Sequence, residues 1–197
     1  MNQATLISRG IPAAQALLLL HRSHTILARE LKKHQQDPLE LPPYFKDRRT
    51  VEEYITDIVE WRLVEDALCY IFMHIGLEVT MDGTDQAREI LRKWSHIRSD
   101  QDMIVNGYKV EIQMARKNLS SYDMKEYKIH NMIRDKSCIF WVLVETWEFF
   151  TIREENVTVM DKKVNAKRWG KIVYNISDTR LRESWMIKKI KSLSIWI

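Results

Sequence analysis

The stretch SDQDMIVNGYKVEIQMARK, from Ser99 to Lys117, is the part of the sequence that decides the fold. It holds Asn106-Gly107 between two runs of alternating apolar and polar residues. This dipeptide is typical of a two-residue hairpin loop, because both central residues of a type I′ turn need a positive φ. With these two residues as the loop, Asp102 stands opposite Glu111, and such opposed residues have Cβ atoms about 5 Å apart. The sequence therefore predicts a hairpin that brings two carboxylates together.

The two faces of this hairpin differ in polarity. Side chains alternate between the faces of a strand, so Gln113 lies beside Glu111 and Asp100 beside Asp102 on the polar face. The other face is apolar and consists of Met103, Val110, Ile112 and Met114. Like charges directly opposite each other destabilise a sheet. Something must offset this repulsion, and a divalent cation is the simplest candidate.

The composition is that of a soluble globular protein. Its 197 residues are 45% hydrophobic and 29% charged, with a net charge of +4. This charge permits nucleic acid or an anionic surface as a partner but requires neither. Cys69 and Cys138 lie in apolar runs, which predicts buried, reduced thiols and a cytoplasmic location. The apolar run from Ala13 to Leu20 is too short to cross a bilayer, so we expect no membrane partner.

Residues 1–50 are expected to form a helix followed by a linker. The helix begins near Pro12 and ends at about His34. Apolar residues and one histidine recur along it at spacings of four and three, at Ala13, Leu17, Leu20, His24, Leu27 and Leu31. This seam fits packing on the core of the domain or, as the second interpretation, a homodimer interface. Three prolines between Asp37 and Arg49 predict an extended linker.

Residues 51–152 alternate between predicted helices and strands. Thr50 and Glu53 fit a capping box, so a helix begins at Val51, and Gly76 would end it after Ile75. The remaining elements are expected to be a strand at Leu77–Met81, a basic helix from Asp85 to Arg98, the hairpin, a helix from about Ser120 to Arg134 opened by a second capping box, and strands at Cys138–Val144 and Trp147–Ile152. This order predicts an α/β (α+β) fold in which helices flank a central mixed sheet.

Basic residues outside the hairpin are candidates for contact with DNA. Three groups stand out: Arg88, Arg92 and Lys93 in the basic helix, Lys117, Lys125 and Lys128 after the hairpin, and Lys167 and Arg168 beside Trp169. Such clusters suit the phosphate backbone. The alternatives are a solvated helix face for the first group and a loop with a core tryptophan for the last. Residues 153–197 form a basic C-terminal segment, which ends in a predicted helix from Asp178 to Leu193 that packs on the core.

The arrangement around the hairpin resembles the PD-(D/E)XK nuclease superfamily, which includes restriction endonucleases and Holliday-junction resolvases. The resemblance covers about Val51 to Ile152. It rests on Asp102, on the triplet Glu111-Ile112-Gln113, and on the segment VEDALCYIFMHIGLEVT. It implies a restriction-endonuclease-like core at residues 51–152 that follows the N-terminal helical extension. By the same resemblance, Asp102 and Glu111 bind Mg²⁺, with Mn²⁺ as a substitute, and Glu65 completes the site.

This sequence departs from the family pattern in two places. Gln101 precedes Asp102 where the family has a proline, and Gln113 replaces the usual lysine. An amide can orient water but supplies no positive charge. Lys117, Lys125 or Lys128 is expected to supply the missing cation. Glu60 is the alternative to Glu65 as the carboxylate of the helix, since an acidic group in a buried helix is costly unless it is paired or functional.

The resemblance implies a magnesium-dependent DNA endonuclease of restriction or phage type. A metal lowers the pKa of a bound water and neutralises charge on a phosphodiester. Two alternatives remain open: a non-catalytic DNA-binding or interaction protein that retains the nuclease fold, and a structure-specific resolvase or nickase. A homodimer through the N-terminal helix would let two sites cut two strands.

Overall fold

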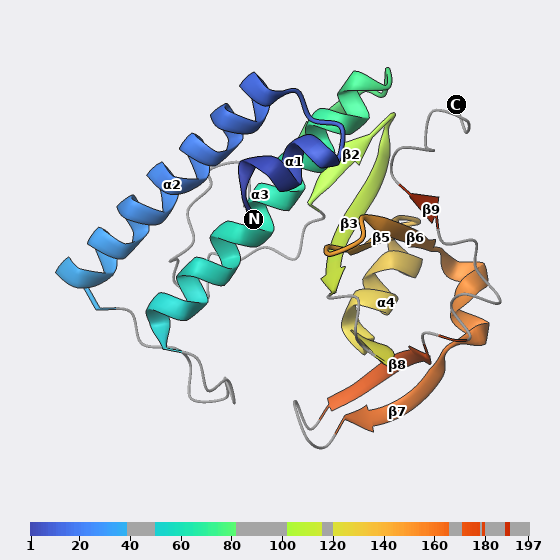
Figure 1. The fold of residues 1–197 in the computed structure, drawn as a ribbon. Helices are drawn as coiled ribbons and strands as arrows, with labels where there is room; N and C mark the ends of the chain where they lie inside the picture. The colour runs from blue at the N-terminus through green and yellow to red at the C-terminus, as the bar shows by residue number, and fades with distance from the viewer. Residues whose placement is uncertain are drawn as a thin grey trace. The chain divides into compact units, whose positions relative to one another are not determined.

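A computed structural model describes residues 1–38, 50–81, 102–115, 120–165, 171–177, 179 and 188–189. The chain divides into two units, Met1–Asp100 and Gln101–Ile197, which are described separately here. Figure 1 shows the elements of both units. The predicted basic helix from Asp85 to Arg98 and most of the predicted Asp178–Leu193 helix lie outside the described residues.

The first unit consists of helices α1 (Gln3–Ser8), α2 (Ala13–Gln36) and α3 (Val51–His74) and the short strand β1 (Val79–Met81). The predicted capping box at the start of α3 is confirmed. The N–H of Glu53 donates to Thr50 Oγ1 at 3.2 Å, and the N–H of Thr50 donates to Glu53 Oε2 at 2.7 Å. Gly76 follows α3 with φ +91°, a conformation that glycine adopts without strain. Both ends of this helix were therefore predicted correctly from local sequence.

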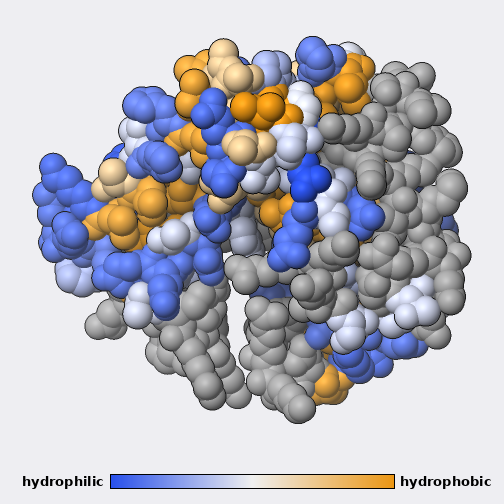
Figure 2. Space-filling view, viewed as in Figure 1, coloured by the Kyte–Doolittle hydropathy of each residue, from blue (hydrophilic) through white to orange (hydrophobic). Residues whose placement is uncertain are grey.

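Helices α2 and α3 lie side by side and run in opposite directions (Figure 1). Ile26 of α2 packs with Ile55 and Val59 of α3. The predicted seam of α2 is confirmed in part, because Leu27 and Leu31 are partly buried against this cluster. The fully buried positions lie beside the seam, at Ala16, Leu19, Ile26 and Glu30. Leu17, which belonged to that seam, is 54% exposed. The described surface of this helix mixes hydrophilic and hydrophobic residues (Figure 2). The homodimer interface through α2 stays a prediction.

The second unit holds a mixed sheet, as predicted. Its strands are β2 (Met103–Val105), β3 (Tyr108–Ala115), β5 (Cys138–Leu143), β6 (Glu148–Ile152) and β9 (Lys188–Lys189), in the spatial order β2-β3-β5-β6-β9. Strands β3 and β5 are parallel, and the other neighbours are antiparallel. Since Lys188–Lys189 is a strand, the predicted terminal helix is wrong at those two residues. No helix of the described residues is long and apolar enough to cross a membrane.

The β2–β3 hairpin has the predicted turn and register. Asn106 has φ +47° and Gly107 has φ +80°, both positive as a type I′ turn requires. Met103 pairs with Val110, and Val105 pairs with Tyr108. The apolar face is confirmed as a core face, because Met103 and Val110 are buried.

The predicted helix from Ser120 to Arg134 is wrong in its first part. Residues Ser121–Lys125 form strand β4, and helix α4 begins only at Glu126 and ends at Arg134. Strand β4 pairs with β8 (Lys171–Ser177), which also pairs with β7 (Asp161–Asn165), so these strands make a second sheet. Tyr122 and Met124, two residues apart, are both buried, which a strand allows because alternate side chains share a face. Residues 121–125 therefore form a strand that pairs with β8, although the local sequence from Ser120 to Asp123 fits a helix cap.

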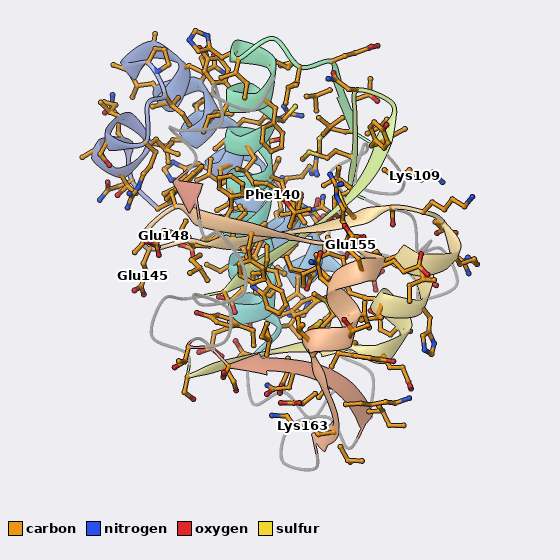
Figure 3. The ribbon with its side chains drawn as sticks, turned by 90° about the vertical axis from the view of Figure 1, so that its right-hand side faces the viewer. Lys109, Phe140, Glu145, Glu148, Glu155 and Lys163 are labelled. Atoms are coloured by element: carbon orange, nitrogen blue, oxygen red, sulfur yellow. The ribbon has the colours of Figure 1, made fainter. Side chains whose placement is uncertain are left out.

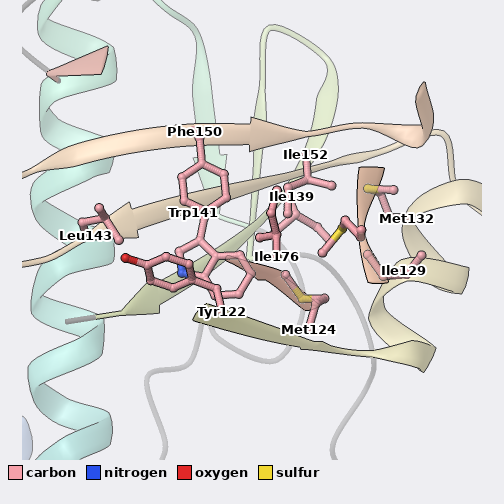
Figure 4. Close-up of a cluster of buried hydrophobic side chains, with 11 residues drawn as sticks. Tyr122, Met124, Ile129, Met132, Ile139, Trp141, Leu143, Phe150, Ile152 and Ile176 are labelled. Carbon is pink, nitrogen blue, oxygen red and sulfur yellow. The ribbon is translucent and has the colours of Figure 1, made fainter. Parts of the chain in front are cut away.

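One hydrophobic cluster joins the main sheet, the second sheet and α4 (Figure 4). Trp141 of β5 stacks on Phe150 of β6 with ring centroids 5.4 Å apart, and Tyr122 of β4 meets Trp141 edge-on at 5.5 Å. Ile129 and Met132 contribute the buried face of α4. A 3₁₀ helix (Glu154–Val159) connects β6 to β7. This cluster fixes α4 against one face of the main sheet.

Replacing Gly107 with alanine tests the turn that sets the hairpin. A methyl group there would meet no atom within 4 Å beyond the adjacent residues, so only the positive φ opposes it. We expect Gly107→Ala to lower the free energy of unfolding by about 1 kcal/mol, measured by urea denaturation. Asn106→Gly is the control, and its effect should stay within about 0.5 kcal/mol because glycine accepts a positive φ. A Gly107→Ala variant as stable as the original protein would contradict the type I′ turn.

Candidate functional site

The candidate site lies on the face of the hairpin that α4 covers. In the parallel pairing of β3 with β5, Glu111 is the partner of Ile139 and Gln113 the partner of Trp141. Ile139 and Trp141 belong to the cluster that includes Ile129 of α4. Because paired residues of neighbouring strands point to the same face, Glu111 and Gln113 share that face with α4.

Asp102 directly precedes Met103, the first paired residue of β2, so the register extended by one residue would place it opposite Glu111. Its N–H donates to the carbonyl oxygen of Val110, the partner of Met103, at 3.2 Å. Its carboxylate turns back to the partner strand, where Oδ2 accepts the N–H of Ile112 at 2.5 Å. The hairpin therefore brings Asp102 and Glu111 together through backbone bonds.

Glu111 is held by two side-chain donors. Gln113 Nε2 donates to Glu111 Oε1 at 2.9 Å and also to the Ile112 carbonyl oxygen at 2.9 Å. Lys128 Nζ, from α4, donates to the same Oε1 atom and forms an ion pair with the carboxylate. Among the described residues, no donor is placed on Glu111 Oε2. We call Asp102, Glu111, Gln113 and Lys128 the carboxylate–lysine site.

Lys128 keeps its positive charge in this site. Its side chain is 23% exposed and that of Glu111 is 18% exposed. Burial lowers the pKa of Lys128, but the charge of Glu111, together with a smaller contribution from Asp102, raises it overall above the ordinary value. Lys128 thus meets the negative charge of both carboxylates. It offsets the repulsion between them for which the sequence had suggested a divalent cation.

Of the two described lysines among the three expected to replace the family's lysine, Lys128 is the one that bonds Glu111. Lys125 ends β4, and its ammonium lies 5.9 Å from the ring centroid of Tyr127. Lys117 and the other predicted DNA-contacting residues, Arg88, Arg92, Lys93, Lys167 and Arg168, lie outside the described residues. Tyr127 was not among the residues predicted from the sequence. Its position between Lys125 and Lys128 was the feature that could have indicated it.

The two candidate carboxylates of α3 differ in their surroundings. Glu65 is buried, at 8% exposure. Glu60 is exposed and accepts from the N-terminal ammonium group of Met1 at 3.4 Å. Both residues belong to the first unit, which is described separately from the carboxylate–lysine site, so their role stays a prediction.

The donor set of the site suits a Mg²⁺ ion that keeps water and phosphate oxygens as ligands. It does not suit a metal ion that is enclosed by protein ligands alone. The described residues hold no group of three or more histidine, cysteine, aspartate or glutamate side chains able to bind a metal. Mg²⁺, however, is commonly held by one or two carboxylates and completes its shell with water and substrate phosphate oxygens. Asp102 and Glu111 meet this smaller requirement, and both donors of the described residues that bond Glu111 use its Oε1 atom. The residues therefore fit a magnesium ion that is bound together with substrate.

No family model, curated protein or solved structure matches this chain.

Neutralising each carboxylate in turn tests the ion pair. Glu111→Gln leaves Lys128 without its carboxylate, so we expect the free energy of unfolding to fall by about 1–2 kcal/mol without added metal. Asp102→Asn should change it by less than about 0.5 kcal/mol, because the amide oxygen can still accept the N–H of Ile112. Urea denaturation measures both values. A larger loss for Asp102→Asn than for Glu111→Gln would contradict this assignment of the charges.

The raised pKa of Lys128 also predicts how the ion pair responds to pH. A lysine whose pKa is raised on folding stabilises the protein fully below its unfolded pKa and loses this effect as pH rises through its folded pKa. We expect the stability difference between the original protein and Lys128→Met to be constant from neutral pH upward and to shrink above the ordinary lysine value of 10.5. Parallel denaturation series at several pH values would measure it. A difference that shrinks already below pH about 9 would show that the pKa is lowered instead.

Proposed function

We propose that this protein is a magnesium-dependent endodeoxyribonuclease of restriction or phage type, related to the PD-(D/E)XK superfamily. The observation that carries the proposal is the bond from Lys128 to Glu111, opposite Asp102. Two carboxylates and a lysine are the set that the family resemblance calls for. Gln113 takes the lysine's place in the sequence, and Lys128 brings the charge from α4 instead.

The order of elements supports the same proposal. The hairpin β2–β3 is followed, after β4, by α4 and then by β5, which lies parallel to β3. A hairpin followed by a helix and a further strand is the order on which the resemblance rests. In this arrangement α4 covers the hairpin face that bears Glu111, so a residue of the helix can act together with residues of the strand.

Each residue of the site has a part in phosphodiester hydrolysis. Asp102 and Glu111 would hold the magnesium, which when bound lowers the pKa of a coordinated water and neutralises charge on the phosphate. Lys128 keeps its proton and stabilises the additional negative charge that develops on the phosphate oxygens. Gln113 fixes Glu111 and can orient the attacking water through its amide. A water oxygen would then form a bond to phosphorus and give up its proton to solvent, while the bond from phosphorus to the leaving oxygen breaks and that oxygen takes a proton from solvent.

The second candidate function is a non-catalytic DNA-binding or interaction protein that retains this fold. It is favoured by one observation, namely that Lys128 forms an ion pair with Glu111. In that case the ion pair would serve to fix α4 on the sheet. The homodimer through α2 and the cytoplasmic location are parts of the main proposal, the latter because Cys69 and Cys138, which are half-buried and not buried as predicted, form no disulfide with each other.

Cleavage of supercoiled plasmid tests the choice between these two functions. We expect nicking or linearisation with Mg²⁺ and none with EDTA. Asp102→Asn, Glu111→Gln and Lys128→Met should each reduce the rate by about 100-fold or more, since each removes a charge that acts on the reacting phosphate. Lys163→Met is the matched control, because Lys163 extends from β7 in the second sheet (Figure 3) and pairs with Asp123. Its rate should stay near that of the original protein.

The non-catalytic function predicts a different outcome in the same experiments. The original protein would then cut neither plasmid, branched DNA nor RNA with Mg²⁺ or Mn²⁺, and Mg²⁺ would leave its melting temperature unchanged. A metal that binds the folded state must raise this temperature, so the melting measurement does not depend on finding the right substrate.

A further inference from the structure

Helix α4 carries an exposed aromatic side chain directly beside the carboxylate–lysine site. Tyr127 is 49% exposed and immediately precedes Lys128, the residue that bonds Glu111. The ammonium of Lys125 lies 5.9 Å from its ring centroid, which is the distance of a cation–π contact. Tyr127 and Lys128 are consecutive residues of α4, so the exposed ring is one residue away from the ammonium that bonds Glu111.

Packing among the described residues of the second unit leaves about half of this ring exposed. Helix α4 docks through Ile129 and Met132, whose exposures are 0% and 2%. Two other tyrosines of this unit pack in its core, Tyr122 at 1% exposure and the partly buried Tyr174. An exposed aromatic ring together with a lysine is the combination on which proteins stack the bases of single-stranded nucleic acid, since every base has a π face.

We propose that Tyr127 and Lys125 form a stacking platform that takes the base next to the phosphate held at the carboxylate–lysine site. The inference rests on the proposed nuclease function for the identity of its ligand. Bases of an intact duplex are already stacked on each other, so a platform of this kind selects a strand with an unpaired nucleotide. The substrate class is therefore DNA with a single-stranded or branched region.

Lys125 has two partners available in this arrangement. In the free protein its ammonium lies over the Tyr127 ring. When a strand is bound, the same ammonium can neutralise a backbone phosphate while the base stacks on the ring. The ammonium of Lys125 would then exchange its contact with the aromatic ring for a contact with a DNA phosphate.

Binding without metal tests the platform separately from catalysis. The probes are a fluorescein-labelled single-stranded oligonucleotide and its duplex, measured by fluorescence anisotropy in EDTA. We expect the original protein to prefer the single strand. Tyr127→Leu keeps the apolar volume and the helix propensity but lacks the flat ring, and should weaken single-strand binding about 5-fold to 100-fold. Duplex binding should change less than about 2-fold, since no base stacks there.

Two further variants control this experiment. Tyr127→Phe keeps the ring and should bind the single strand like the original protein. Tyr108→Leu is the matched control, because Tyr108 is 71% exposed but lies next to the hairpin turn, on the face of β3 opposite to that of Glu111. Equal losses for Tyr108→Leu and Tyr127→Leu, or no loss for Tyr127→Leu, would overturn the platform.

The two proposals fail in different ways. Magnesium-dependent cleavage that requires Asp102, combined with unchanged binding by Tyr127→Leu, would leave the nuclease standing and refute the platform. Single-strand binding that requires the Tyr127 ring, in a protein that cuts nothing, would support the platform and favour the non-catalytic function.

Discussion

The repulsion between two carboxylates on one hairpin is the constraint on which the second unit depends. A type I′ turn fixes the register, and the Asp102 carboxylate bonds the N–H of Ile112, the residue next to Glu111. Like charges in this position destabilise a sheet unless a cation lies near both. Lys128 is that cation in the structure, and it reaches the hairpin only because α4 lies on this face. The charge balance of the hairpin therefore depends on the position of α4.

The position of α4 is set in turn by the second sheet. Strand β4 uses Tyr122 and Met124 to close the cluster around Trp141, and the helix begins only after the last residue of this strand. Its partner β8 comes about fifty residues later in the chain, so the start of α4 depends on a long-range contact. Apolar packing between two sheets thus decides where a charged residue can reach the hairpin.

The features that were predicted from the sequence are those decided by neighbouring residues. The hairpin turn, the capping box at Thr50 and the buried strand Cys138–Leu143 depend on local chemistry and burial pattern, and all three are confirmed. The start of α4 was predicted too early because a serine three residues before an aspartate fits a cap as well as a strand. A continuous helix would have put Lys125 and Lys128 on one face, three residues apart. With Lys125 in a strand the two lysines separate, and the sequence could not say which one meets Glu111.

The net charge of the carboxylate–lysine site suggests how a bound metal could control its attraction for phosphate. Asp102 and Glu111 each contribute one negative charge and Lys128 one positive charge, so the site carries −1 in total when its lysine is protonated. Without the metal, the site itself would offer a phosphodiester no net electrostatic attraction, so DNA that binds in EDTA would be held by stacking and by basic side chains outside the site. A magnesium ion would change the sum to +1 and make the same site attractive to phosphate without any movement of the backbone. Because the raised pKa keeps Lys128 charged, this change of sign would be made by the metal and not by the lysine.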